Sequence, residues 1–150
     1  MYKNSVTHYI AKALVDIMFF GGIVCTILSP WIAKSIRDFE AWGMTEYWIV
    51  TLTLFASGVC SVFILYTLKQ MFKTLLGGNP FVEANVNCFR KMAVACSLIS
   101  LIYIVRCFLI FTIASVTIVL VFAIGTLFCL TLKDIFKQAV FYKEEHDWTV

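Results

Sequence analysis

Charged residues are almost absent from three long stretches of the chain. Residues 13–33 contain only Asp16, residues 48–68 contain no charge, and residues 92–132 contain only Arg106. A helix crosses the apolar core of a bilayer with about 20 residues. The third stretch, about 41 residues long, would make a helix of roughly 60 Å, so it must fold back on itself. The pattern therefore predicts four membrane spans, at about residues 11–33, 48–70, 91–110 and 114–136, with the last turn near 111–115.

A polar segment separates the second span from the third. Residues 69–76 continue the helical pattern of the second span, and Gly77–Gly78 should end that helix because glycine accepts a left-handed conformation. We expect Asn79 to cap the following helix and Pro80 to be its first residue. The segment 70–90 is therefore predicted to be a helical hairpin that extends beyond the membrane, and residues 137–150 form a tail.

The composition agrees with a lipid environment. Hydrophobic residues make up 61% of the chain and charged residues only 14%, against roughly 25% charged residues in soluble domains. We predict an all-α integral membrane protein, a single-domain antiparallel four-helix bundle with the hairpin between its second and third helices. The net charge of +3 is scattered along the chain, which argues against direct nucleic-acid binding.

The distribution of basic residues predicts the orientation, because cytoplasmic segments of membrane proteins carry more lysine and arginine. If the N-terminus is cytoplasmic, nine basic residues are inside and three are outside. The nine are Lys3, Lys12, Lys69, Lys73, Arg90, Lys91, Lys133, Lys137 and Lys143, and the three are Lys34, Arg37 and Arg106. Both termini and the hairpin are therefore expected in the cytoplasm.

No catalytic or metal-binding pattern is present in the sequence. The six cysteines fall mostly in apolar runs and form no C-x-x-C pair, and His8 and His146 are isolated. A metal site needs more ligands than these residues supply. We expect no enzymatic activity, no cofactor and no metal.

Two charges lie inside predicted spans, where each is costly. Asp16 should meet Lys69 or Lys133 at the inner rim, and Arg106 should extend to the outer headgroups; a role in binding an ion, lipid or ligand is the alternative. Small residues at four-residue spacing in each span favour close helix packing, with a lined channel or a ligand cavity as the alternative.

The remaining polar segments are the outer loop and the tail. Ile32, Ile36 and Phe39 recur at helical spacing, so the loop 34–46 is either a helix along the membrane surface or an extended connection. The fourth helix should run to about Lys143, after which the acidic end should fold under the bundle and be anchored on the hairpin by Trp148.

Parts of the hairpin and the tail resemble a known family. The resemblance rests on Gly78, Pro80, Phe81, Glu83, Asn85 and Arg90, and on Phe136, Ala139, Lys143, Glu144, Glu145, Asp147, Thr149 and Val150. These positions resemble the pattern of the bacterial four-span membrane proteins of domain-of-unknown-function family 2975. The sequence departs from that pattern at Phe89, His146 and Trp148. The resemblance implies four membrane helices in a bacterial plasma membrane, no established activity, and genes often adjacent to that of a small helix-turn-helix regulator.

The leading functional hypothesis is a non-enzymatic regulatory or scaffold protein that binds a cytoplasmic partner through residues 72–90 and the tail. Besides the lipid bilayer, the partner would be a small helix-turn-helix regulator, another membrane protein or a second copy. The candidate contact residues are Phe81, Val82, Glu83, Val86, Phe89, Arg90 and Trp148. The alternatives are an immunity protein against a membrane-active peptide, acting through the outer loop, and a small oligomeric transporter or channel.

Overall fold

The computed structural model describes residues 6–40, 43–78 and 80–148 and contains five helices in these ranges, with no strand. In chain order these helices are α1 (Val6–Ile27), α2 (Ser29–Glu40), α3 (Met44–Leu76), α4 (Glu83–Leu109) and α5 (Ile113–Trp148). Four of them are long and apolar enough to cross a membrane: α1 from His8, α3, α4, and α5 as far as Lys143. The predicted spans therefore lie on four separate long helices.

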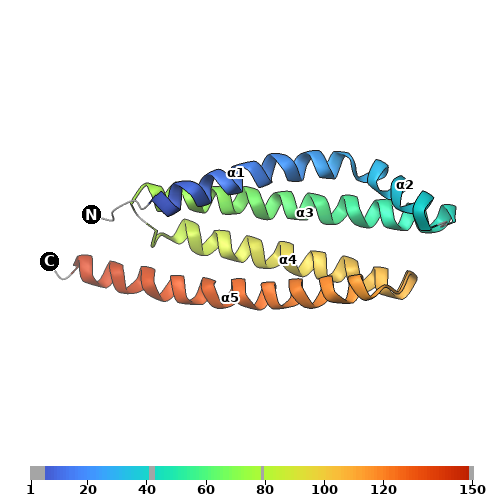
Figure 1. Cartoon of the computed structure of the whole chain (residues 1–150). Coiled ribbons are helices and arrows are strands. Elements are labelled where there is room, and N and C mark those ends of the chain that lie inside the picture. The colour runs from blue at the N-terminus through green and yellow to red at the C-terminus, as the bar shows by residue number, and fades with distance from the viewer. Residues whose placement is uncertain (1–5, 41–42, 79, 149–150) are drawn as a thin grey trace.

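The helices form an open row. Figure 1 shows α1, α3, α4 and α5 side by side in that order, with successive helices running in opposite directions. Among the described residues, α1 contacts only α2 and α3, and α5 contacts only α4. The expected four-helix bundle is therefore not closed, because no contact joins its first helix to its last. Such a row is stable in lipid, where an uncovered apolar face has no water to avoid.

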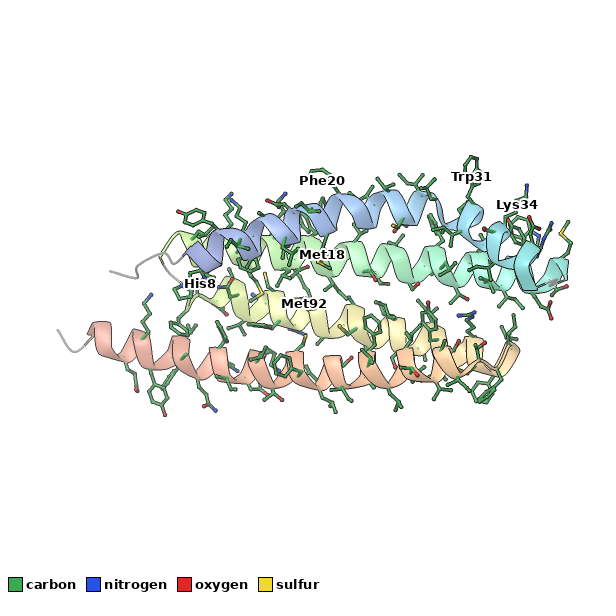
Figure 2. The ribbon with its side chains drawn as sticks, in the orientation of Figure 1. His8, Met18, Phe20, Trp31, Lys34 and Met92 are labelled. Carbon is green, nitrogen blue, oxygen red and sulfur yellow. The ribbon has the colours of Figure 1, made fainter. Side chains whose placement is uncertain are left out.

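Apolar side chains cover the outer faces of the row. Phe108, Ile113 and Phe128 are 87%, 79% and 62% exposed, and Figure 2 shows Phe20 and Trp31 pointing away from the neighbouring helices. Such large exposed apolar faces are untenable in water and match the hydrocarbon core of a membrane.

The first predicted span contains a break. α1 ends at Ile27 and α2 begins at Ser29, so the last residues of the predicted span 11–33 belong to α2. Pro30 explains the break, since it has no N–H to bond to a preceding carbonyl. The outer loop is helical as far as Glu40, which favours the helical alternative over an extended connection; its position along a membrane surface stays a prediction.

The other boundaries follow the predictions closely. α3 ends at Leu76, and Gly78 has a φ of +83°, as expected of a glycine that ends a helix. The turn between α4 and α5 lies at residues 110–112, within a residue or two of its predicted position. Below, "hairpin end" denotes residues 69–91 with residues 133–148, and "turn end" denotes α2 with the turn 110–112.

The last helix, α5, is longer than a membrane span requires. α5 has 36 residues, about 54 Å at the helical rise, whereas the apolar core of a bilayer is about 30 Å thick. The expected fold-back of the acidic tail is wrong, because α5 continues through residues 144–148. α5 contains no proline and one glycine, Gly125, so no strong helix breaker lies between Gly125 and its end at Trp148. The side chain of Trp148, and therefore its predicted anchoring role, lies outside the described residues.

Candidate functional site

The hairpin is closed by a buried asparagine. Asn85 is 2% exposed; its side-chain amide donates to the Pro80 carbonyl at 2.7 Å, and its Oδ1 accepts from the Thr74 hydroxyl at 2.8 Å. One side chain thus ties the end of α3 to the start of α4. This arrangement corrects the predicted helix start. α4 begins at Glu83 with the extended Val82 before it, so Pro80 is not a first helical residue.

The predicted cap on Asn79 lies outside the described residues. The structural role of Asn85 was missed at the level of sequence, where the residue entered only through the family resemblance. The spacing of Asn85 from apolar residues could have indicated its burial, since it lies three positions after Val82 and four before Phe89, on one side of a helix. A polar side chain buried with such neighbours must find hydrogen-bond partners.

Three phenylalanines hold the hairpin against α5. The ring of Phe136 lies 5.6 Å from that of Phe81 and 4.9 Å from that of Phe89, measured between centroids. Phe89 is 7% exposed and Phe81 is 44% exposed. The side chain of Phe89 is therefore covered by α5, whereas Phe81 keeps part of its surface. A contact of either residue with a partner stays a prediction.

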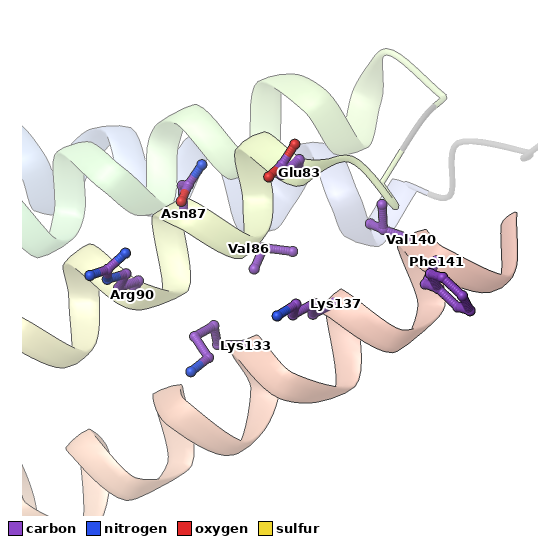
Figure 3. Close-up of a pocket in the computed structure, with 8 residues that line it drawn as sticks. All are labelled: Glu83, Val86, Asn87, Arg90, Lys133, Lys137, Val140 and Phe141. Carbon is purple, nitrogen blue, oxygen red and sulfur yellow. The ribbon is translucent and has the colours of Figure 1, made fainter. Parts of the chain in front are cut away.

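A groove lies next to this cluster, between the start of α4 and the end of α5. Its volume is about 540 Å³. The side chains that line it are Glu83, Val86, Asn87 and Arg90 from α4, and Lys133, Lys137, Val140 and Phe141 from α5. In Figure 3, Val86 and Lys137 point into the space between the two helices from opposite sides. Three of the predicted contact residues, Glu83, Val86 and Arg90, are thus brought together, and α5 adds residues that the sequence analysis did not select.

The groove combines an apolar floor with positive charge. Arg90, Lys133 and Lys137 line it together with a single carboxylate, that of Glu83. The Lys133 ammonium lies 3.0 Å from Asp134, whose side chain is 66% exposed, so this pair is largely hydrated. A positively charged groove with apolar contacts suits an acidic, partly apolar ligand.

The two charges within the spans are separate from this groove. The Asp16 carboxylate lies 2.9 Å from the Lys69 ammonium, which confirms Lys69 as one of its two predicted partners; Lys133 pairs with Asp134 instead. The Lys69 ammonium also lies 5.4 Å and 5.7 Å from the ring centroids of Phe19 and Phe20. The pair joins α1 to α3 near the hairpin end.

Arg106 is placed differently. Its guanidinium carbon lies 5.7 Å from the centroid of the Tyr103 ring. Its Nε is buried and makes no hydrogen bond to any described part of the chain. Arg106 and Asp16 do not pair with each other.

No cluster of metal ligands is present in the described part of the chain. The six cysteines are free thiols, and no group of three His, Cys, Asp or Glu side chains gathers within residues 6–40, 43–78 and 80–148.

Four apolar helices of spanning length, with apolar outer faces, define a multi-pass membrane protein. The chain belongs to the family described as protein of unknown function (DUF2975), whose model matches residues 9–150. This match confirms the resemblance found in the hairpin and the tail. No curated protein and no solved structure matches the chain.

Proposed function

We propose that this membrane protein is a non-enzymatic regulator or scaffold that binds an acidic, amphipathic segment of a cytoplasmic protein at its hairpin end. The observation that carries the proposal is the groove lined by Val86, Arg90 and Lys137 between the start of α4 and the end of α5. Its cations would meet the acidic side chains of the partner, and Val86, Val140 and Phe141 would meet its apolar face.

The rigidity of the groove supports binding rather than simple connection of two spans. One wall is held by the Asn85 hydrogen bonds and the other by packing of Phe136 on Phe81 and Phe89. A preformed surface binds with a smaller ordering cost than a flexible loop. A connector between two spans would need neither the buried asparagine nor the aromatic cluster.

The cytoplasmic side is part of the proposal. It rests on the excess of lysine and arginine at the hairpin end and assumes a bacterial plasma membrane with both chain termini inside the cell. The family resemblance suggests a small helix-turn-helix regulator as the first partner to test, with another membrane protein as the second.

Site-specific crosslinking in native membranes tests the groove. A photoreactive residue at Asn87, which lines the groove, should crosslink a discrete partner in cells. Charge reversal of Arg90 and Lys137 to Glu should abolish the crosslink, because it would repel an acidic segment.

The matched control is Lys34→Glu, a charge reversal on exposed α2 at the opposite end of the molecule. It should leave the crosslink intact. If the doubly reversed variant crosslinks the same species as the unmodified protein, or if Asn87 gives no crosslink at all, the groove is not the docking surface.

A further inference from the structure

A second groove, at the turn end, is lined by one charged side chain, that of Arg106. It lies between α3 and α4 and has a volume of about 340 Å³. Its lining is Leu52, Thr53 and Ala56 from α3, and Leu101, Ile102, Val105, Arg106 and Leu109 from α4. Arg106 is its only charged residue, and Thr53 uses its hydroxyl on the Ile49 carbonyl at 2.7 Å. The groove is therefore an apolar channel with a single cation.

Arg106 has no carboxylate partner among the described side chains. Of the acidic residues at this end whose side chains are described, Asp38 lies 3.3 Å from Arg37, and Glu46 accepts the Gly43 N–H at 2.7 Å. The buried Nε of Arg106 makes no hydrogen bond, although a buried donor without an acceptor is costly and most buried donors are satisfied. The Tyr103 ring, 5% exposed, supports the guanidinium carbon at 5.7 Å. The site thus holds a guanidinium in place and supplies no anion for it.

The depth of Arg106 matches the phosphate layer of a bilayer. It precedes the last residue of α4, Leu109, by three positions, which is about 5 Å along the helix. Trp31, on α2, and Trp48, near the start of α3, are 76% and 59% exposed at the same end of the molecule, and tryptophan gathers at membrane interfaces. From Arg106 the groove runs past Val105 and Leu101 toward the middle of the membrane, where acyl chains lie.

We propose that this groove binds one glycerophospholipid, with its phosphate on Arg106 and an acyl chain along Leu101, Val105 and Ala56. Charge complementarity selects this occupant: a phosphate supplies acceptors for the guanidinium, and the chain fills an otherwise apolar channel. Because no acid lines the groove to receive a cationic headgroup, phosphatidylglycerol binds better than phosphatidylcholine. The site lies at the opposite end from the partner groove and does not depend on the proposed function or on which face of the membrane is cytoplasmic.

Native mass spectrometry of the full-length protein in detergent micelles, titrated with phosphatidylglycerol, tests the site. Arg106→Gln removes the charge, and Ala56→Phe fills the groove while leaving Arg106 in place. Each should weaken binding of the first phosphatidylglycerol about tenfold, a difference of about 1.4 kcal/mol. Arg106→Lys, which keeps a cation, should retain most of the binding, and Val59→Phe, at an exposed position of α3 outside the groove, should retain all of it.

Two comparison ligands separate the sources of the signal. Inorganic phosphate at the same concentration should not compete, since it lacks the chain, and phosphatidylcholine should bind more weakly. A titration is interpreted only for a variant that remains monodisperse and helical. If Arg106→Gln does not fold, the binding of phosphatidylglycerol by Ala56→Phe tests the proposal instead. Full phosphatidylglycerol binding by a folded Arg106→Gln or Ala56→Phe protein, or equal loss in Val59→Phe, would overturn the proposal.

Discussion

Helices α4 and α1 are both apolar and both long enough to span a membrane, yet their surroundings differ sharply. A third of the most apolar window of α4 is buried in the protein (33%), against 6% of that of α1. α4 lies between α3 and α5, whereas α1 contacts only α3 and the short α2. The same kind of sequence therefore produces a central helix and a peripheral one.

The difference lies in what holds each helix. α4 buries residues along its whole length, from Asn85 through Ala93 and Ile99 to Tyr103. α1 packs along α3 alone among the long helices, and its contacts include the Asp16–Lys69 pair and a close approach of Thr26 to Gly58. In lipid, apolar burial gives little driving force between helices, so packing and polar contacts decide which helices associate. We therefore expect that removing a polar contact of α4 lowers the unfolding free energy more than removing a polar contact of α1.

The largest expected effect is at Asn85. Asn85→Ala removes two hydrogen bonds and leaves the Pro80 carbonyl without its amide partner, so unfolding should require about 2 kcal/mol less free energy. Unfolding in mixed micelles of mild detergent and dodecyl sulfate, followed by tryptophan fluorescence, measures this loss.

The control for Asn85 is two residues away. Asn87→Ala changes the same residue type on the same helix, but at an exposed position in the groove, and should change the unfolding free energy by less than about 0.5 kcal/mol. Equal losses in the two variants would show that the hydrogen bonds across the hairpin do not hold it together.

Much of the fold could be predicted from sequence, because a helix that crosses a bilayer must be apolar over about 20 consecutive residues. The four long helices, the helix end at Gly77–Gly78 and the turn after α4 follow from the length of apolar runs and from glycine chemistry. The open arrangement could not be predicted in the same way. Span counting gives the order of helices, but whether α1 meets α5 depends on side-chain packing between distant segments.

The candidate site was predicted only in part, for a related reason. Glu83, Val86 and Arg90 were found because they lie on one short polar segment of the sequence. Lys137 and Phe141 were not singled out within the tail, because the sequence does not show which face of the last helix packs beside the start of α4. For Phe89 the sequence left two contacts open, because its apolar side chain fits a buried contact with α5 as well as an exposed one with a partner, and the structure shows the contact with Phe136.

A smaller effect is expected at the contact of α1 with α3. A Cβ on Gly58 would lie 2.6 Å from the Thr26 hydroxyl oxygen and 3.2 Å from its Cβ. The Thr26 side chain is short and already bonded to the Gly22 carbonyl at 2.7 Å. Gly58→Ala should therefore push the two helices apart and cost about 1 kcal/mol, because overpacking outweighs the helix propensity gained. The same mixed-micelle unfolding assay measures it.

Two variants make this prediction specific. Gly125→Ala, where the nearest heavy atom would be the Cys96 sulfur at 3.9 Å, should be neutral or slightly stabilising. Thr26→Ala should restore most of the stability of Gly58→Ala, since it removes the atoms that clash, and the double-mutant cycle isolates this pair. A Gly58→Ala protein as stable as Gly125→Ala would mean that α1 does not approach α3 at this point.

The smallest effect is expected at the ion pair of α1. Asp16→Asn removes the negative charge facing Lys69, but the two side chains are 32% and 39% exposed, and the lysine can extend to the nearby headgroups. The unfolding free energy should fall by less than about 1 kcal/mol. The control is Asp134→Asn, which breaks the more exposed pair with Lys133 and should cost no more than Asp16→Asn. If Asp16→Asn instead costs as much as Asn85→Ala, charge rather than burial fixes α1. The explanation of the contrast between α1 and α4 by burial would then be wrong, although the helices would still make the same contacts.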